Sequence, residues 1–154
     1  MSFNIGLQDS QIQVSQALPS SGNNITTGVI DMQAIAPRSR AWGDGLFAVT
    51  IPAIPENTSS TGITIALQAA PPSLTGGSSA IAPLQPGPGT FITPTCAQTI
   101  TIPAVTGTGS AASVAYFTLA LDANGSAYQF YQFLITNPGV TTSGEVLTIA
   151  WENA

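Results

Sequence analysis

Basic side chains are almost missing from this 154-residue sequence. It has no lysine and no histidine, and its only cations are Arg38 and Arg40. Charged residues make up 6% of the chain, whereas an ordinary soluble domain has about 25%. Proteins bind nucleic acid and anionic membrane surfaces through clusters of lysine and arginine. We therefore expect neither nucleic acid nor a membrane among the partners of this chain.

The same absences argue against catalysis. Without histidine, the commonest general base and the usual organiser of a catalytic triad are missing, and without lysine no Schiff base can form. Only a pair of carboxylates could act, as in glycoside hydrolysis. The acids fall mostly in predicted turns or at strand ends, and nothing in the sequence places two of them together. We expect no enzymatic activity and no cofactor. The acids considered are Asp31, Asp44, Glu56, Asp122, Glu145 and Glu152.

A metal site has little support in the sequence. Cys96 is the only cysteine, which excludes an internal disulfide and argues against a cysteine-based metal site. Asp122-Ala-Asn-Gly-Ser126 has the spacing that opens a calcium loop, but its glycine comes fourth instead of sixth and Phe133 stands where the twelfth-position glutamate belongs. A hairpin turn is the better interpretation, and we expect no metal.

Long apolar runs are missing as well. None approaches the ~20 residues that span a bilayer. The segment Met1-Ser-Phe-Asn-Ile5 lacks the basic start and apolar core of a signal peptide. We expect the chain to be made in a cytoplasm and kept there until it is assembled.

What is present predicts an all-β fold. Fifteen glycines and twelve prolines are spread along the chain, so few windows could hold a helix. Between them lie short β-branched and aromatic runs, several alternating at period two. About eight strands indicate one domain over residues 1–154, an antiparallel jelly roll or β-sandwich. The predicted strands are 11–15, 25–32, 46–51, 63–68, 99–102, 113–121, 127–136 and 145–151.

Two connections have their own signals. Asn124-Gly125 is a typical hairpin turn, so residues 113–121 and 127–136 are predicted to pair as a hairpin. Residues 71–94 are rich in Pro, Gly and Ser, which indicates a long connecting loop or an edge excursion available for contacts.

Two groups of side chains are candidates for an interface. The first contains the chain's densest set of contact-type residues, and arginine and tryptophan dominate binding hot spots. An internal Arg–Asp pair that steadies the loop, with the tryptophan capping the core, explains this group equally well. The second group is two tyrosines in an aromatic run, which could line a sheet surface, a subunit interface or a glycan-stacking platform while Phe130 or Phe133 packs the core. The candidates are Arg38, Arg40, Trp42, Asp44, Tyr128 and Tyr131.

The order of these segments resembles one family of viral proteins. Residues 9–17, DSQIQVSQA, resemble the opening of the capsid cement (decoration) proteins of short-tailed phages, of the Bordetella-phage type. The likeness continues through TGVIDM at 27–32, an Arg-containing loop that runs into WGDG at 42–45, a strand at 63–68 and VLTI at 146–149. The resemblance implies a jelly roll that forms homo-oligomers on the outside of an icosahedral head and bridges major capsid protein subunits. It carries over no catalytic residue.

Composition and resemblance lead to the same expectation. The polar side chains are mostly Ser, Thr, Asn and Gln, which suits a surface that ends against other proteins, where Lys, Glu and Asp are depleted. We expect a structural virion protein on the outer capsid surface, whose partners are the major capsid protein and its own copies in a homodimer or homotrimer. Residues 1–21 are predicted to form an extended arm that is exchanged with a neighbour or laid onto it. The main alternative is a glycan-binding jelly-roll module of a phage fibre or tail component.

Overall fold

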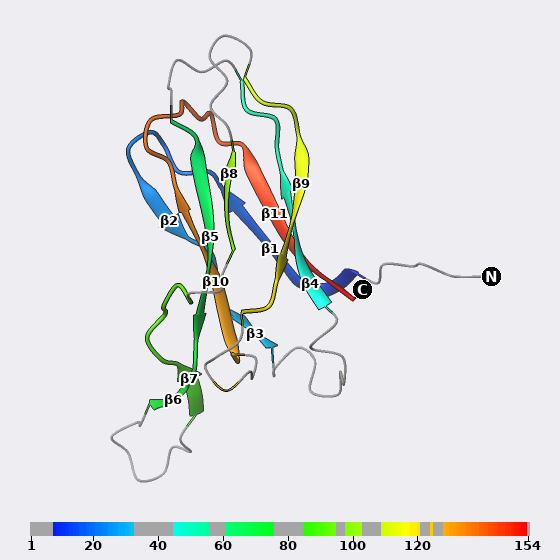
Figure 1. The fold of residues 1–154 in the computed structure, drawn as a ribbon, viewed down its shortest axis with the longest axis vertical. Helices are drawn as coiled ribbons and strands as arrows, with labels where there is room; N and C mark the ends of the chain where they lie inside the picture. Colours follow the sequence, from blue (N-terminus) through cyan, green and yellow to red (C-terminus); the bar gives the residue numbers. More distant parts are fainter. Residues whose placement is uncertain are drawn as a thin grey trace, which may run out of the picture.

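The fold was analysed in a computed structural model, which describes residues 8–32, 45–55, 61–75, 85–94, 98–102, 109–120, 124 and 128–153. Every element named in this part of the chain is a β-strand (Figure 1). The strands are β1 (Gln8–Ala17), β2 (Asn24–Thr26), β3 (Ile30–Asp31), β4 (Gly45–Ile51), β5 (Ile63–Ala70), β6 (Pro72–Thr75), β7 (Gln85–Pro88), β8 (Thr99–Ile102), β9 (Ser113–Thr118), β10 (Phe130–Thr136) and β11 (Val146–Asn153).

The strands form two facing antiparallel sheets. Sheet A has the order β1-β11-β4-β9, and sheet B has the order β2-β10-β5-β8, with β3 also paired to β10. Among the eight strands of these two orders, the first pairs with the last, the second with the seventh, the third with the sixth and the fourth with the fifth. This nested pairing is the wrapping of a jelly roll, so the predicted fold class is confirmed.

The core lies between the two sheets and follows the alternation in the sequence. Ile63, Ile65 and Leu67 of β5 are fully buried, while the residues between them are half-buried. The ring of Phe47 on β4 lies at the centre of an aromatic cluster that spans both sheets. Its centroid is 5.1 to 5.7 Å from three other rings, which suits the edge-to-face packing that aromatic pairs prefer. The three are Tyr131, Phe133 and Trp151.

The predicted strand 25–32 is interrupted in its middle. The main-chain N–H of Thr27 donates to the oxygen of Phe133, but the N–H of Phe133 donates to the side-chain Oγ1 of Thr27 instead of a main-chain oxygen. A side chain has taken over one rung of the ladder, as Thr hydroxyls can. The segment is therefore divided into β2 and β3 on the same neighbour, β10.

The predicted hairpin between residues 113–121 and 127–136 is wrong. β9 pairs with β4 in sheet A, and β10 pairs with β5 in sheet B, so the connection between them crosses from one sheet to the other. Both strands place large apolar side chains on the inner face, and each buries them better against the opposite sheet than beside the other. A local turn signal does not decide pairing when burial favours a crossover.

The predicted arm is also different from the structure. Residues 8–17 form the edge strand β1 of the chain's own sheet A, paired with β11, and Leu18 is buried in the core. Residues 1–7 lie outside the described part of the chain. The segment 8–18 is therefore part of the sandwich in this structure and not a free extension.

The proline-rich excursion 71–94 contains a two-stranded ribbon. β6 and β7 pair with each other over four residues and with neither large sheet. In Figure 1 this ribbon lies beyond one end of the sandwich, continuing from the end of β5. The chain returns to sheet B through a bridge between Ala69 and Ile92.

Candidate functional site

The carboxylates of the described residues are tied to local structure. Oδ1 of Asp31 accepts a hydrogen bond from Nε2 of Gln129 at 3.2 Å, and Oε2 of Glu145 accepts one from the N–H of Ser143 at 2.7 Å. Within the described ranges, no group of three His, Cys, Asp or Glu side chains is placed to hold a metal ion. In the same ranges, no helix has the length and hydropathy needed to cross a bilayer.

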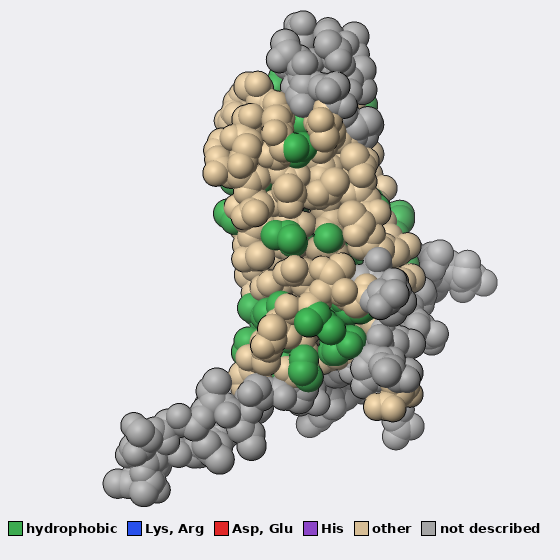
Figure 2. Space-filling model, turned by 60° about the vertical axis from the view of Figure 1, so that its left-hand side comes forward, with side chains coloured by type: hydrophobic (Ala, Val, Ile, Leu, Met, Phe, Trp, Pro, Cys, Tyr) green, Lys and Arg blue, Asp and Glu red, His purple; other side chains and the backbone are tan. Residues whose placement is uncertain are grey.

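The outer face of sheet B is built from uncharged side chains over most of its rows, and an acid, Asp31, enters only in the row of Phe130 at the β3 end. Residues directly opposite in neighbouring strands share a face, so each register gives one row of this surface. One row is Asn24, Thr136, Thr64 and Thr101, and the next is Thr26, Leu134, Ala66 and Thr99. Figure 2 shows no acidic or basic atom among the described residues in this view.

A side-chain bond ties the two central strands of this face together. Nε2 of Gln132 on β10 donates to Oε1 of Gln68 on β5 at 2.8 Å. The two amides satisfy part of each other's hydrogen-bonding capacity, which lowers the cost of covering them. A partner that covers these rows meets hydroxyls, amides and methyl groups, with no charge to desolvate within them.

The outer face of sheet A has the same character over two rows. Ser15, Thr148, Thr50 and Val114 form one row, and Gln13, Ala150, Ala48 and Tyr116 form the other. In the second row Ala150 and Ala48 are buried, so its exposed surface comes from Gln13 and Tyr116. Glu152 stands in the next row, so charge enters only at the end of this face. Both broad faces of the sandwich therefore offer a neutral, mostly polar surface.

Strand β9 is a free edge of sheet A in the sense that no described strand pairs with its outer side. The N–H of Thr118 donates to Oε1 of Gln98 at 3.0 Å, so the main-chain groups of Thr118 point away from β4. Main-chain direction alternates along an antiparallel strand, so the N–H and C=O groups of Val114 and Tyr116 also point to the free edge. The same two side chains are 50% and 54% exposed.

β9 lacks the features that usually protect a sheet edge. Proteins protect edges with very short strands, bulges, proline or charge. The opposite edge of sheet A, β1, has a register shift between Gln8 and Gln13, while the edges of sheet B, β2 and β8, have three and four residues. β9 runs for six residues in unbroken register with β4 and has no charged or proline residue. It is the edge best suited to accept another strand in the described part of the chain.

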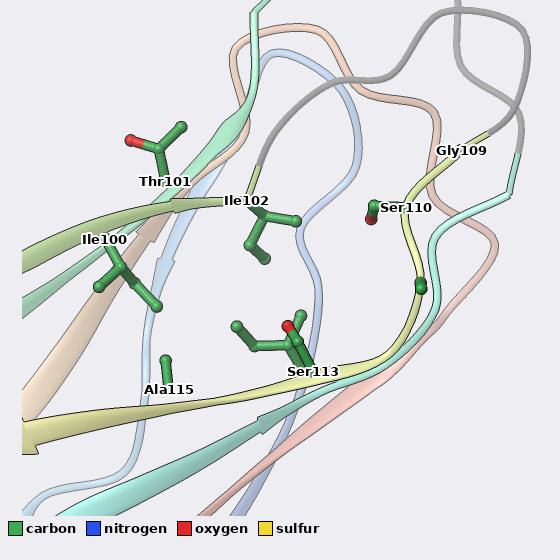
Figure 3. Close-up of a pocket in the computed structure, with 9 residues that line it drawn as sticks. Ile100, Thr101, Ile102, Gly109, Ser110, Ser113 and Ala115 are labelled. Carbon is green, nitrogen blue, oxygen red and sulfur yellow. The ribbon is translucent and has the colours of Figure 1, made fainter.

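A cavity of about 440 Å³ opens beside this edge. It lies where β9 of sheet A and β8 of sheet B, two edge strands of opposite sheets, leave the core accessible. Its apolar wall is formed by the inward side chains of Ile51, Ile100, Ile102 and Ala115. Figure 3 shows Ile100 and Ile102 extending from β8 towards β9. The volume lies in the range of pockets that hold ligands or side chains of partners.

The polar wall of the cavity is held by a close main-chain contact. Ile54 and Ser110 exchange two main-chain hydrogen bonds of 2.9 Å. Gly109 precedes Ser110 with a φ of 66° and lies so close to the oxygen of Ile54 that a Cβ could not fit. The Oγ of Ser110 is buried and makes no hydrogen bond within the described residues. The rim therefore places this hydroxyl beside the cavity, whose lining also includes Thr101 and Ser113.

The two predicted groups of interface residues have different outcomes. The first group, Arg38, Arg40, Trp42 and Asp44, lies outside the described residues, so it stays a prediction. In the second group, Tyr131 has no exposed surface and packs in the core, so its assignment to the surface is wrong. Tyr128 is half-buried and packs against the core.

The sequence did not predict the free edge, because both faces of β9 contain apolar residues. In Ser-Val-Ala-Tyr-Phe-Thr, either Val114 and Tyr116 or Ala115 and Phe117 could face inward, since both pairs are apolar. Only the register with β4 decides that Phe117 is buried and Tyr116 is exposed. No period-two signal could have identified the edge.

Comparisons with known protein families, curated proteins and solved structures found no match to this chain. The class of protein is therefore defined by its own topology and surface: in the described ranges it is a jelly roll with two faces that are neutral over most of their rows and with an open sheet edge, β9, beside a largely apolar cavity.

Proposed function

We propose that this protein is a structural component of a virion: a capsid cement protein that binds the outside of a tailed-phage head and bridges subunits of the major capsid protein. The observation that carries the proposal is the neutrality of both broad faces over most of their rows. The resemblance of the N-terminal and C-terminal segments to cement proteins supports the same conclusion.

Binding through such faces would take its free energy from a large buried area rather than from charge pairs. A stable protein interface buries about 1,600 Å² in total, and each face presents rows of Thr, Ser, Gln and Ala side chains that cost little to desolvate compared with charges. Each copy would contact several shell subunits, and many simultaneous contacts raise the strength of attachment without raising the affinity of any one.

The aromatic run does not favour the alternative of a glycan-binding module. A stacking platform needs exposed rings, but Phe130, Tyr131 and Phe133 are at most 3% exposed and Tyr128 is only half-exposed at best. Tyr116 is the exposed aromatic residue in the described ranges, and Val114 and Ala48 are its neighbours. A single ring without adjacent acids or amides is a poor carbohydrate site.

The direct test is co-sedimentation of the purified protein with heads of the phage that encodes it, prepared without the protein. The proposal predicts saturable binding at a fixed number of copies per head. Two variants probe the faces: Thr64→Lys adds a charge to the outer face of sheet B, and Thr50→Lys adds one to the outer face of sheet A. Burying an unpaired charge in an interface is costly, so we expect at least one variant to lose binding.

Ala53→Lys is the matched control. It adds the same charge at an exposed residue of the connection after β4, outside both faces, and should bind as the unmodified protein does. If the unmodified protein stays in the supernatant, or if both face variants bind unchanged, the proposed attachment through neutral faces is wrong.

A further inference from the structure

The free edge of β9 and the cavity lie next to each other, so one extended segment along the edge would contact both. A strand added to β9 would bond to the outward N–H and C=O groups of Val114 and Tyr116. Its alternate side chains would then face Ala115 and enter the apolar cavity between β9 and β8. Recognition of this kind takes affinity from main-chain bonds and specificity from pockets for alternate side chains.

We propose that the segment is residues 1–7 of a second copy of this chain. Its sequence, Met-Ser-Phe-Asn-Ile-Gly-Leu, places apolar residues at every odd position and small or polar residues at every even one. This is the period-two pattern of a half-buried strand. No side chain in it is charged, and neither is any side chain of β9.

The lengths match. Seven extended residues span about 23 Å, which is enough to lie along the six residues of β9. With Ile5 opposite Ala115, Phe3 and Leu7 fall on the same inner face, next to the cavity, while Asn4 and Gly6 lie on the outer face with Val114 and Tyr116.

A second copy fits better than the same chain. Residue 8 begins β1, at the edge of sheet A opposite to β9, with β11 and β4 between them. Three strand spacings are about 14 Å. A segment of about 23 Å that first crosses this distance keeps roughly three residues for pairing, too few to follow β9. Residues 1–7 of a neighbouring copy do not have to cross sheet A and can pair with β9 over their whole length.

The proposed contact has a direction. The donor segment precedes β1 at one edge of sheet A, and the receptor strand β9 is the other edge. The two surfaces of a contact are therefore different, and a head-to-tail contact of this type closes into a ring when its rotation allows. The inference does not depend on capsid binding, because purified protein alone should form the ring.

The test is the mass of the full-length protein in solution, measured by light scattering after gel filtration, for the unmodified chain and three variants. Ile5→Asp places a charge on the inner face of the donor segment. Asn4→Asp is its matched control, with the same charge one residue away on the outer face. Tyr116→Pro removes an N–H that points to the free edge, a change that edge strands tolerate because the ladder to β4 stays intact.

We expect one closed oligomer for the unmodified chain and for Asn4→Asp. We expect a single-chain mass of 15.6 kDa for Ile5→Asp and for Tyr116→Pro. Circular dichroism melts must show that both monomeric variants remain folded. A peptide of residues 1–7 should then bind monomeric Ile5→Asp, and binding should be lost when Tyr116→Pro is added.

Several results would overturn the inference. A monomeric unmodified chain, an unchanged oligomer in Ile5→Asp, or equal dissociation by Ile5→Asp and Asn4→Asp each excludes the proposed insertion. An oligomer that survives in Tyr116→Pro would assign self-association to another surface. Failure of co-sedimentation with heads, by contrast, would leave this contact standing.

Discussion

The hydroxyl of Tyr131 donates a hydrogen bond to the main-chain oxygen of Ala120, at 2.9 Å in the buried core. Tyr131 belongs to β10 in sheet B, and Ala120 follows the end of β9 in sheet A. The same hydroxyl accepts the N–H of Tyr128 at 3.0 Å. One side chain therefore secures both ends of the connection that crosses between the sheets.

Replacing Tyr131 with phenylalanine should lower the free energy of unfolding by about 1–3 kcal/mol. The ring stays in place, but a buried oxygen and a partly buried N–H each lose a partner. Chemical denaturation of the purified protein measures the change. Tyr128→Phe is the control, because its half-buried ring supplies no hydroxyl to this link, and it should change stability by less than about 0.5 kcal/mol. Equal effects of the two substitutions would mean that the link contributes little.

Asn137 should be one of the most sensitive polar positions. It is fully buried, and its amide makes four hydrogen bonds: Nδ2 donates to the oxygens of Pro19 and Val140, and Oδ1 accepts from the N–H groups of Gly139 and Val140. These bonds join the turn after β1 to the connection before β11. Asn137→Ala should therefore cost about 3 kcal/mol of unfolding free energy.

Thr142→Val tests whether that cost is specific to Asn137. Thr142 donates to the same oxygen of Pro19 at 3.1 Å, but its side chain is only half-buried. Its loss should cost about 1 kcal/mol. Thermal or chemical unfolding measures both losses. If Asn137→Ala lowered the unfolding free energy no more than Thr142→Val, the four bonds of Asn137 would not stabilise the contact between these two connections.

Gly109 should not tolerate a side chain. Its φ of 66° is unfavourable for alanine by about 1–2 kcal/mol, and a Cβ would meet the main-chain oxygen of Ile54. We expect Gly109→Ala to lower stability by more than about 2 kcal/mol and to disturb the bridge at the cavity rim. Gly28→Ala is the matched control, since Gly28 has open space and no positive φ. Indistinguishable melting curves would contradict this description of the rim.

Much of the fold was predictable because burial repeats at short range. The alternation over 63–68 identified β5 and its inner face, and the predicted strand 99–102 has the bounds of β8. The separation of β9 and β10 into different sheets was not predictable from the Asn124-Gly125 turn signal, because sheet assignment depends on which distant strands cover each apolar face. The division of 25–32 depends on one side-chain bond, from the N–H of Phe133 to Thr27.

The candidate site was less accessible to sequence reasoning than the fold. The free edge exists because β4 covers one side of β9 and no described strand covers the other. The paired residues of β4 and β9 are far apart in the sequence, as Ala48 and Tyr116 show. The cavity depends on two edge strands of opposite sheets lying side by side. By contrast, the neutrality of the faces could be expected from composition alone, since the whole chain has nine charged side chains.

The salt dependence of attachment to heads tests the central claim most directly: that this jelly roll adheres through neutral surfaces. Protein bound to purified heads is measured by sedimentation as ionic strength rises from 0.01 M, where the Debye length is about 30 Å, to 0.15 M, where it is about 8 Å. Screening acts on charges, so the account predicts a bound fraction that changes less than about twofold. Release of most of the protein over this range would contradict it.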